Sequence, residues 1–198
     1  MSKLFFRYSA MGAGKSLDLL KVAFNYEERG MQVVLYTTAL DNRFGDGIIS
    51  SRTGISKTAH VFTGETNFLE HFKSNYFEAD KLINCVLVDE AQFLTKHQVV
   101  HLRKIVTDYG VPVIAYGLRT DFRGDLFEGS EWMLAWADTL EELKTICWCG
   151  KKATMNARLV GGAVVKDGAQ ILIGGNESYI ALCPTHFWIG EVRTTHLV

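Results

Sequence analysis

A phosphate-binding loop is the first chemistry that the sequence suggests. Residues 9–16 are Ser-Ala-Met-Gly-Ala-Gly-Lys-Ser, placed after an apolar run and before a helical pattern. In that setting backbone N–H groups and the helix N-terminus bind phosphates, Lys15 reaches the β- and γ-phosphates, and the Ser16 hydroxyl ligates Mg²⁺. Ser9 stands where the common pattern has glycine, and the alternative is a chance Gly-Lys-Ser turn. We predict that the whole loop lies at phosphate: Ser9, Ala10, Met11, Gly12, Ala13, Gly14, Lys15 and Ser16.

Two adjacent carboxylates, Asp89 and Glu90, follow the apolar run at residues 84–88. Ligands of open α/β sheets bind at the carboxyl ends of the strands, so both side chains are expected near the P-loop. Asp89 would complete the Mg²⁺ shell with Ser16. Adjacent strand residues point in opposite directions, which leaves Glu90 free to act as a base on a substrate hydroxyl. The alternative is an acidic turn without chemistry.

Three of the four cysteines and one histidine form two short pairs near the end of the chain. Cys147 and Cys149 are one residue apart, and Cys183 and His186 follow after an insert of hairpin size. Thiolates and an imidazole at these spacings suit a tetrahedral, structural Zn²⁺ site. Three unrelated buried thiols are the alternative. Cys85, inside the run before Asp89, is expected to be a small core residue.

Two further stretches leave alternatives open. In residues 116–124, Phe122 is equally suited to be a base-stacking platform or a loop anchor. Residues 170–179 suit either a hairpin strand with a Gly-Gly turn or a loop whose backbone binds a small polar ligand. Taken singly, Arg43, Arg52 and Arg158 are expected to be solvated charges. The histidines other than His186 are expected on helix or strand surfaces.

An alternation of strands and helices must position these residues. Apolar runs typical of buried parallel strands alternate with helical patterns, which predicts an α/β fold with a P-loop NTPase-like parallel sheet flanked by helices. The predicted strands are residues 3–8, 31–38, 60–62, 84–88 and 111–118. The predicted helices are residues 16–29, 68–76, 95–109 and 128–137. Thr95 and Gln98 stand at capping-box spacing, and the polar stretch 41–54 is expected to be a mobile loop.

The character of the chain changes near residue 144. Beyond this point lie 7 of the 18 glycines and three of the four cysteines. We therefore predict two domains, a nucleotide-binding domain at residues 1–144 and a smaller zinc-ribbon domain at residues 145–198.

Composition limits the classes of function. The chain has 198 residues, 47% of them hydrophobic, and a net charge of −1, so it has no strong field to attract nucleic acid or an anionic membrane. No signal-peptide-like run and no apolar stretch of about 18 residues is present, so a cytoplasmic protein is expected. Two rival functions remain, a P-loop ATPase or GTPase that uses water and a zinc-ribbon module for nucleic acid. The balanced charge disfavours the second rival.

In their order along the chain, these motifs resemble those of the cytosolic, tetrameric type II thymidine kinases, above all the bacterial and phage branch. The resemblance covers nearly the whole chain, and the motifs that carry it are residues 8–16, 41–45, 51–54, 88–93, 116–124, 126–127, 147–150 and 173–176, with Tyr179 and Cys183. Two departures, Ser9 and the missing basic residue before His186, should not alter the chemistry. The resemblance implies transfer of the ATP γ-phosphate to the 5′-hydroxyl of thymidine, inhibition by thymidine triphosphate (dTTP) and a homotetramer.

The resemblance also implies roles for individual residues. Glu90 would be the general base, and Arg43 with the 41–54 loop would close over the phosphates. Asp89 and Gln92 would also belong to the ATP- and phosphate-binding residues. The thymidine pocket would contain Met11, Leu118, Phe122 and Phe127, with Tyr179 on the deoxyribose. The backbone that binds the base would come from Gln170, Ile171, Leu172, Ile173 and Gly174. Zinc on Cys147, Cys149, Cys183 and His186 would hold the segment between the cysteine pairs over the base as a lasso.

Overall fold

The computed structural model describes residues 1–41, 43–79, 81–172 and 178–193. Its main body is a six-stranded sheet in the order β5-β2-β6-β7-β1-β8, in which every neighbouring pair is parallel. The strands are β1 (Leu4–Ser9), β2 (Val33–Thr38), β5 (His60–Phe62), β6 (Cys85–Val88), β7 (Val113–Leu118) and β8 (Thr139–Glu142). The predicted α/β class with a P-loop-like parallel sheet is confirmed.

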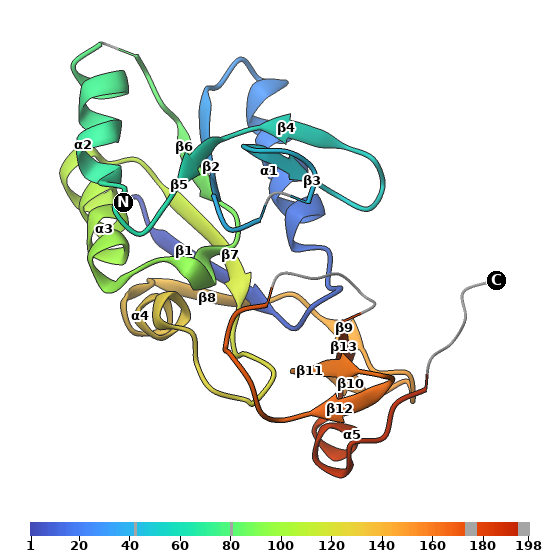
Figure 1. Cartoon of the computed structure of the whole chain (residues 1–198). Coiled ribbons are helices and arrows are strands. Elements are labelled where there is room, and N and C mark those ends of the chain that lie inside the picture. Colours follow the sequence, from blue (N-terminus) through green and yellow to red (C-terminus); the bar gives the residue numbers. More distant parts are fainter. Residues whose placement is uncertain (42, 80, 173–177, 194–198) are drawn as a thin grey trace.

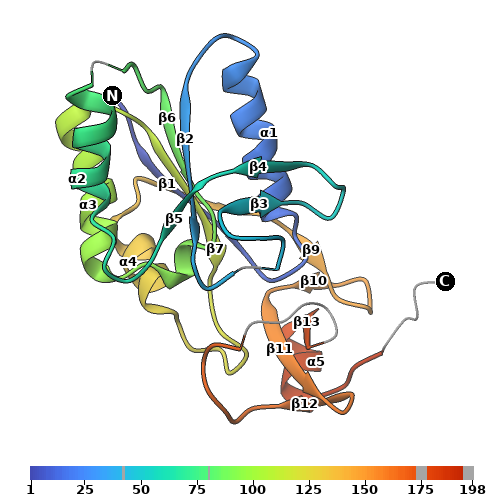
Figure 2. The ribbon, with the colours of Figure 1, turned by 45° about the horizontal axis from the view of Figure 1, so that its top comes forward.

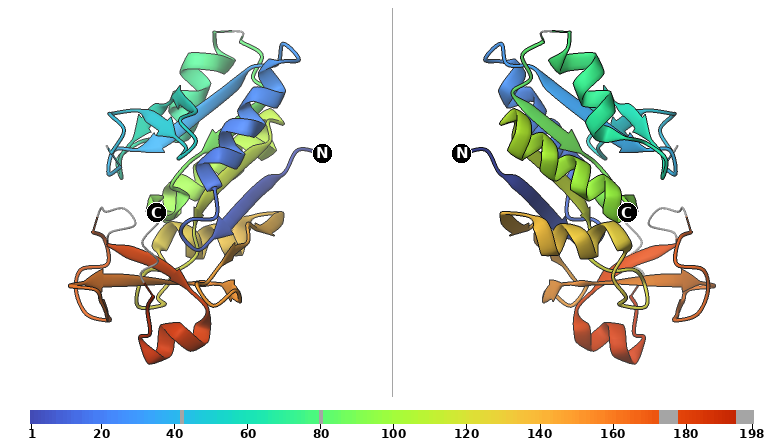
Figure 3. Two further views of the ribbon diagram at one scale, coloured as in Figure 1. Left: turned by 90° about the vertical axis from the view of Figure 1, so that its right-hand side faces the viewer. Right: turned by 90° about the vertical axis from the view of Figure 1, so that its left-hand side faces the viewer.

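Helices cover both faces of this sheet (Figure 1). They are α1 (Lys15–Glu27), α2 (Phe68–Phe72), α3 (Lys96–Tyr109) and α4 (Glu128–Trp136). Helix α1 packs on one face with Leu35 and Leu87, whereas α2, α3 and α4 pack on the opposite face with Val34 and Tyr36. Figure 3 views the sheet from its two faces, with α1 in front of the strands on the left and α3 and α4 in front of them on the right. Successive residues of one strand, such as Leu35 and Tyr36, thus pack into separate cores, as strand geometry requires.

The ends of α3 follow the predicted capping signals. Gln98 N donates to Thr95 Oγ1 at 3.3 Å, and Thr95 N donates to Gln98 Oε1 at 3.0 Å, which completes the capping box. Gly110 ends the helix with φ 68°. The predicted helix at 68–76 is instead two pieces, because α2 ends at Phe72 and a π-helical turn continues over Lys73–Phe77.

Before residue 145, three described strands fall outside the predicted set. β3 (Ile48–Ser50) and β4 (Ser56–Thr58) form an antiparallel hairpin, so the prediction of a loop is wrong for residues 48–50. Among the residues of these two strands only Ile49 is buried, which leaves too short an apolar pattern to find in the sequence. β8 adds a parallel edge strand beside β1 from half-exposed, mostly polar residues.

A smaller lobe follows β8, on the side of the sheet where β1 and β7 end (Figure 2). It contains β9 (Thr145–Ile146), β10 (Lys152–Ala153), β11 (Met155–Val160), β12 (Ala163–Val165), β13 (Tyr179–Leu182) and α5 (Pro184–Ile189). Its own core gathers the buried residues Cys147, Ala153, Ala157, Leu182, Cys183 and Phe187. The division into two domains at residue 144 stays a prediction. Within the described ranges, no helix is long and apolar enough to cross a membrane.

Candidate active site

The P-loop joins the end of β1 to the start of α1. Gly12 and Gly14 have φ of 75° and 76°, left-handed conformations that residues with a side chain rarely adopt. Lys15 is buried, and its Nζ donates to Ser9 Oγ at 3.2 Å. Burial lowers the pKa of Lys15, and the charges of Glu90 and Asp89 act against that shift. The loop therefore presents a buried amine and a helix N-terminus to the same space, which suits an anionic ligand.

A side chain of the small lobe also reaches the P-loop. Asn156, buried in β11, accepts a hydrogen bond from Met11 N at 2.8 Å and donates one from Nδ2 to Thr120 O at 2.8 Å. The Met11 amide is thus engaged by a side chain, while Met11 was predicted at phosphate. Nothing in the local pattern around Asn156 marks it for this role, and sequence reasoning missed it.

The two predicted Mg²⁺ ligands meet across the gap between β1 and β6. Ser16 Oγ donates to Asp89 Oδ2 at 3.0 Å, and Asp89 is buried. Burial, followed by the neighbouring charge of Glu90, raises the pKa of Asp89 to about 7, although the Ser16 hydrogen bond works in the other direction. A hydroxyl and a carboxylate oxygen in contact are ligands that suit Mg²⁺.

Glu90 stands on a strained backbone at the end of β6. Its φ is 54°, in the left-handed region, where a residue other than glycine is uncommon. Gln92, in the 3₁₀ turn Ala91–Phe93, donates from Nε2 to Glu90 Oε2, and its Oε1 accepts from Leu118 N at 3.0 Å. Both ends of the Gln92 amide are therefore engaged beside Glu90 and β7. Gln92 was predicted at phosphate, and the structure places it as a brace for Glu90.

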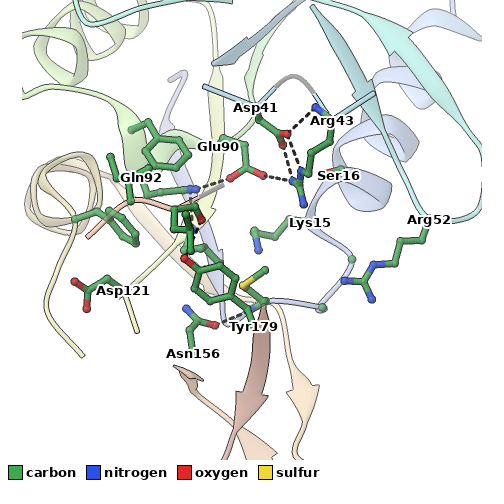
Figure 4. Close-up of a pocket in the computed structure, with 18 of the residues that line it drawn as sticks. Lys15, Ser16, Asp41, Arg43, Arg52, Glu90, Gln92, Asp121, Asn156 and Tyr179 are labelled. Atoms are coloured by element: carbon green, nitrogen blue, oxygen red, sulfur yellow. Dashed lines mark hydrogen bonds and ion pairs between the residues drawn. The ribbon is translucent and has the colours of Figure 1, made fainter. Parts of the chain in front are cut away.

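Arg43 lies opposite Glu90, on the segment between β2 and β3 (Figure 4). It donates to Asp41 Oδ1 from Nε at 2.7 Å and to Asp41 Oδ2 from Nη2 at 2.6 Å, and its Nη2 is 3.9 Å from Glu90 Oε1. Burial raises the pKa of Asp41, but the Arg43 hydrogen bonds and charge outweigh it and leave that pKa below its usual value. Asp41 therefore holds Arg43 next to the carboxylate at the strand end.

A cavity of about 260 Å³ runs from the P-loop to the small lobe. It brings together most of the predicted site residues: Met11, Gly12, Gly14, Lys15, Ser16, Arg43, Glu90, Gln92, Leu118, Phe122, Phe127, Gln170, Ile171, Leu172 and Tyr179. Of the described residues predicted to bind ATP, Mg²⁺ or thymidine, those that do not line it are Ser9, Ala10, Ala13 and Asp89. Ile173 and Gly174 lie outside the described residues.

Several lining residues were not singled out from the sequence. The predicted loop at 41–54 contributes Asp41, Phe44, Ser50, Ser51 and Thr53, and Asp121 and Asn156 come from further along the chain. Asp121 is buried and accepts from Arg123 and, at 3.2 Å, from Gln170 Nε2. The buried carboxylate thus ties residue 170 to the end of β7, a contact that depends on how the two lobes pack.

At the far wall of the cavity one prediction is wrong, and for residues 170–172 the structure decides between two alternatives. Arg158 was expected to be a solvated charge, but its exposed fraction is 4%, so that prediction is wrong. Phe122 is buried in this wall. Residues 170–172 form a loop and not a hairpin strand, and β13 starts only at Tyr179. The Tyr179 hydroxyl donates to Leu172 O at 2.8 Å, which ties the loop to that strand.

The four predicted zinc ligands form one cluster in the small lobe. Their ligand atoms all lie within 4.8 Å of one another, with His186 Nδ1 3.4 Å from Cys147 Sγ and from Cys183 Sγ. Cys149 Sγ and Cys183 Sγ are 3.9 Å apart, close to the separation of two thiolates on one tetrahedral zinc at bond lengths of about 2.3 Å. Trp148 stacks on the His186 ring, with 4.0 Å between ring centroids. The cluster therefore fits a tetrahedral metal ion.

Comparison with known proteins points to one family. The family model for thymidine kinase matches residues 2–187. The chain is 55% identical over 188 residues to the thymidine kinase of Mannheimia succiniciproducens, which covers 94% of this chain and 95% of the relative. It is 53% identical over 196 residues to that of Legionella pneumophila strain Lens, an alignment that covers 98% of this chain and 93% of the relative. It is also 53% identical over 188 residues to that of Haemophilus influenzae, which covers 94% of this chain and 96% of the relative. With this agreement over almost its whole length, the chain belongs to the thymidine kinase family.

Proposed function

We propose that this thymidine kinase moves the ATP γ-phosphate to the 5′-hydroxyl of thymidine with Glu90 as the general base. The observation that carries the proposal is the single cavity that has Lys15 at one end, an aromatic wall at the other and Glu90 between them. In-line transfer needs a donor phosphate and an acceptor hydroxyl in one enclosed space, with a base within hydrogen-bond reach of the hydroxyl.

The phosphate end belongs to the P-loop. Lys15 and the loop amides stabilise charge on the phosphates, and Arg43 turns from Asp41 toward them when they arrive. Ser16 and Asp89 hold Mg²⁺, which neutralises charge on the phosphate oxygens. In the described structure the Met11 amide is bonded to Asn156, so the main contacts come from the amides after it.

Glu90 accepts the proton of the 5′-hydroxyl. Gln92 holds one carboxylate oxygen, and the other faces Arg43 and the cavity. A base that is fixed in this way needs little reorganisation when the hydroxyl attacks.

The other end of the cavity takes thymidine. Met11, Leu118 and Phe127 close the sides, and Phe122 lies in the wall against which the thymine ring packs. The backbone from Gln170 to Leu172 pairs with the polar edge of the base, so a wrong base would leave buried groups unpaired. The Tyr179 hydroxyl is already bonded to Leu172 O, and its contact with the deoxyribose therefore comes from the ring.

Three finer properties complete the proposal. Zn²⁺ on Cys147, Cys149, Cys183 and His186 holds the small lobe together. dTTP binds across the cavity, with its base at the thymidine end and its phosphates at the P-loop, and inhibits the enzyme. The enzyme works in the cytoplasm as a homotetramer, as the family resemblance implies.

A phosphate-transfer panel tests the proposal. Purified protein receives ATP, Mg²⁺ and each of the four natural deoxynucleosides in turn, and nucleoside monophosphate and ADP are both quantified. We expect ADP formation to require thymidine and to match thymidine monophosphate in amount, and Lys15→Ala to abolish both. ADP release that is equal without any nucleoside would support the hydrolase alternative instead. Titration with dTTP tests the inhibition, and the molar mass in solution tests the homotetramer.

A further inference from the structure

Arg158 is a buried cation whose donors converge on one wall of the cavity. It lies in β11 with an exposed fraction of 4%. Its Nη1 donates to Ala169 O at 2.8 Å, and its Nη2 donates to Gln170 O at 3.2 Å. Its Nε and Nη2 donate to the Tyr179 hydroxyl at 3.0 and 2.7 Å. The planar fork of a guanidinium thereby fixes two successive peptide carbonyls and one phenol at once.

The flat face of the same guanidinium covers Phe122. The Arg158 Cζ atom lies 3.7 Å from the centroid of the Phe122 ring, a close cation–π stack. One face of the Phe122 ring is thus covered by Arg158. The loop at 169–172, Tyr179 and the end of β7 all meet at this one side chain.

The partners of Arg158 among the described residues are neutral. Across the residues that the structure describes, no carboxylate lies within 4.0 Å of its guanidinium nitrogens. Burying a cation on neutral acceptors costs free energy that an apolar residue would not. Stability of the lobe alone therefore gives little reason for an arginine at this position.

We propose that Arg158 is a positioning residue for thymidine binding, which locks Phe122, Tyr179 and the 169–172 loop into the shape that receives the base. The inference rests on the proposed function of this cavity. Arg158 lies behind the wall and acts through the groups it orders. Its loss should loosen the thymidine site and leave the P-loop, Glu90 and ATP binding intact.

Kinetics of Arg158→Ala and Arg158→Lys test this. We expect the KM for thymidine to rise about 10- to 100-fold in Arg158→Ala, the size of loss typical when a positioning contact is removed. The kcat at saturating thymidine and the KM for ATP should change less than about threefold. Arg158→Lys keeps the charge but has no planar fork, so its KM should rise nearly as much. Millimolar methylguanidinium should lower the KM of Arg158→Ala, and methylammonium should not.

Arg193→Ala is the matched control. Arg193 stacks on Trp148 at 4.5 Å in the same lobe, with no residue of the cavity involved in the stack. We expect this variant to keep the KM for thymidine. Two results would overturn the inference. One is an unchanged KM for thymidine in Arg158→Ala. The other is a fall of kcat and zinc content together with a rise of both KM values, none of which methylguanidinium reverses. If Arg158→Ala fails to fold, Arg158→Lys decides by the same split. Absence of thymidine phosphorylation in the unmodified enzyme would instead reject the proposed function.

Discussion

Glu90→Gln separates the proposed base from the binding groups around it. The variant keeps the shape of the side chain and removes its basic oxygen. In the structure one carboxylate oxygen accepts from Gln92 and the other lies 3.9 Å from Arg43. A glutamine that keeps its oxygen toward Gln92 turns its NH₂ group toward Arg43. The variant therefore loses both the general base and the attraction between residue 90 and Arg43.

Their magnitudes differ enough to be told apart. The Arg43 side chain is 38% exposed, so its lost attraction to residue 90 is worth about 1 kcal/mol or less, up to roughly fivefold in a binding constant. Loss of a general base typically lowers the rate about 10²- to 10⁴-fold. Phosphoryl transfer depends mainly on positioning and charge, so we expect the lower end, about 100-fold in kcat.

The assay is steady-state kinetics with thymidine and ATP varied separately. We expect kcat to fall about 100-fold while both KM values change less than about fivefold. Glu131→Gln, an exposed substitution on α4, is the control and should match the unmodified enzyme. A kcat near normal in Glu90→Gln would refute the assignment of the base. If kcat/KM falls only because the KM for ATP rises, Glu90 would be assigned to ATP binding.

Three further outcomes are expected. Glu90→Gly should be more stable to urea than Glu90→Ala by about 0.5–1 kcal/mol, because glycine relieves the left-handed φ of 54°; the reverse order would mean that the backbone is unstrained. In zinc-loaded protein a thiol reagent should react slowly, and a chelator should make three of the four thiols reactive. Cys85 should react only after unfolding, because burial raises its pKa to about 12. Three fast-reacting thiols before chelation would contradict the zinc site. Burial and, second, the charge of His60 lower the pKa of His71, whose Nδ1 is hydrogen-bonded to Tyr36 Oη at 2.8 Å. The contribution of neutral His71 to the free energy of unfolding should therefore be fully present above pH 6.5 and be lost as the pH falls below it. His71→Gln should flatten that fall in urea titrations on either side of pH 6.5, and an unchanged slope would exclude His71 as its source.

Local patterns predicted the parts of the site that are themselves local. The P-loop follows from a strand, a glycine-containing turn and a helix within one stretch of chain, and Asp89 meets Ser16 because both follow strand ends of one parallel sheet. The capping box at Thr95 was predictable for the same reason. The zinc cluster needs only two short pairs and a hairpin between them.

Contacts between the lobes could not be predicted in this way. Asn156 meets Met11 across 145 positions of sequence, and Arg158 meets Phe122 only because β11 packs beside the segment that follows β7. Nothing in the residue types on either side distinguishes such a buried polar residue from a solvated one. The left-handed backbone of Glu90 was equally hidden, because that conformation usually signals glycine.

The Asn156 bridge makes the phosphate loop depend on the last quarter of the chain. One amide supplies the acceptor for Met11 N and the donor for Thr120 O, so both groups take a partner from outside the sheet and its helices. A fragment that stops before β9 would leave both backbone groups without this partner beside the nucleotide. The geometry of the P-loop is thereby linked to the folding of the small lobe. The nucleotide site is finished only after the C-terminal segment has been made, folded and docked.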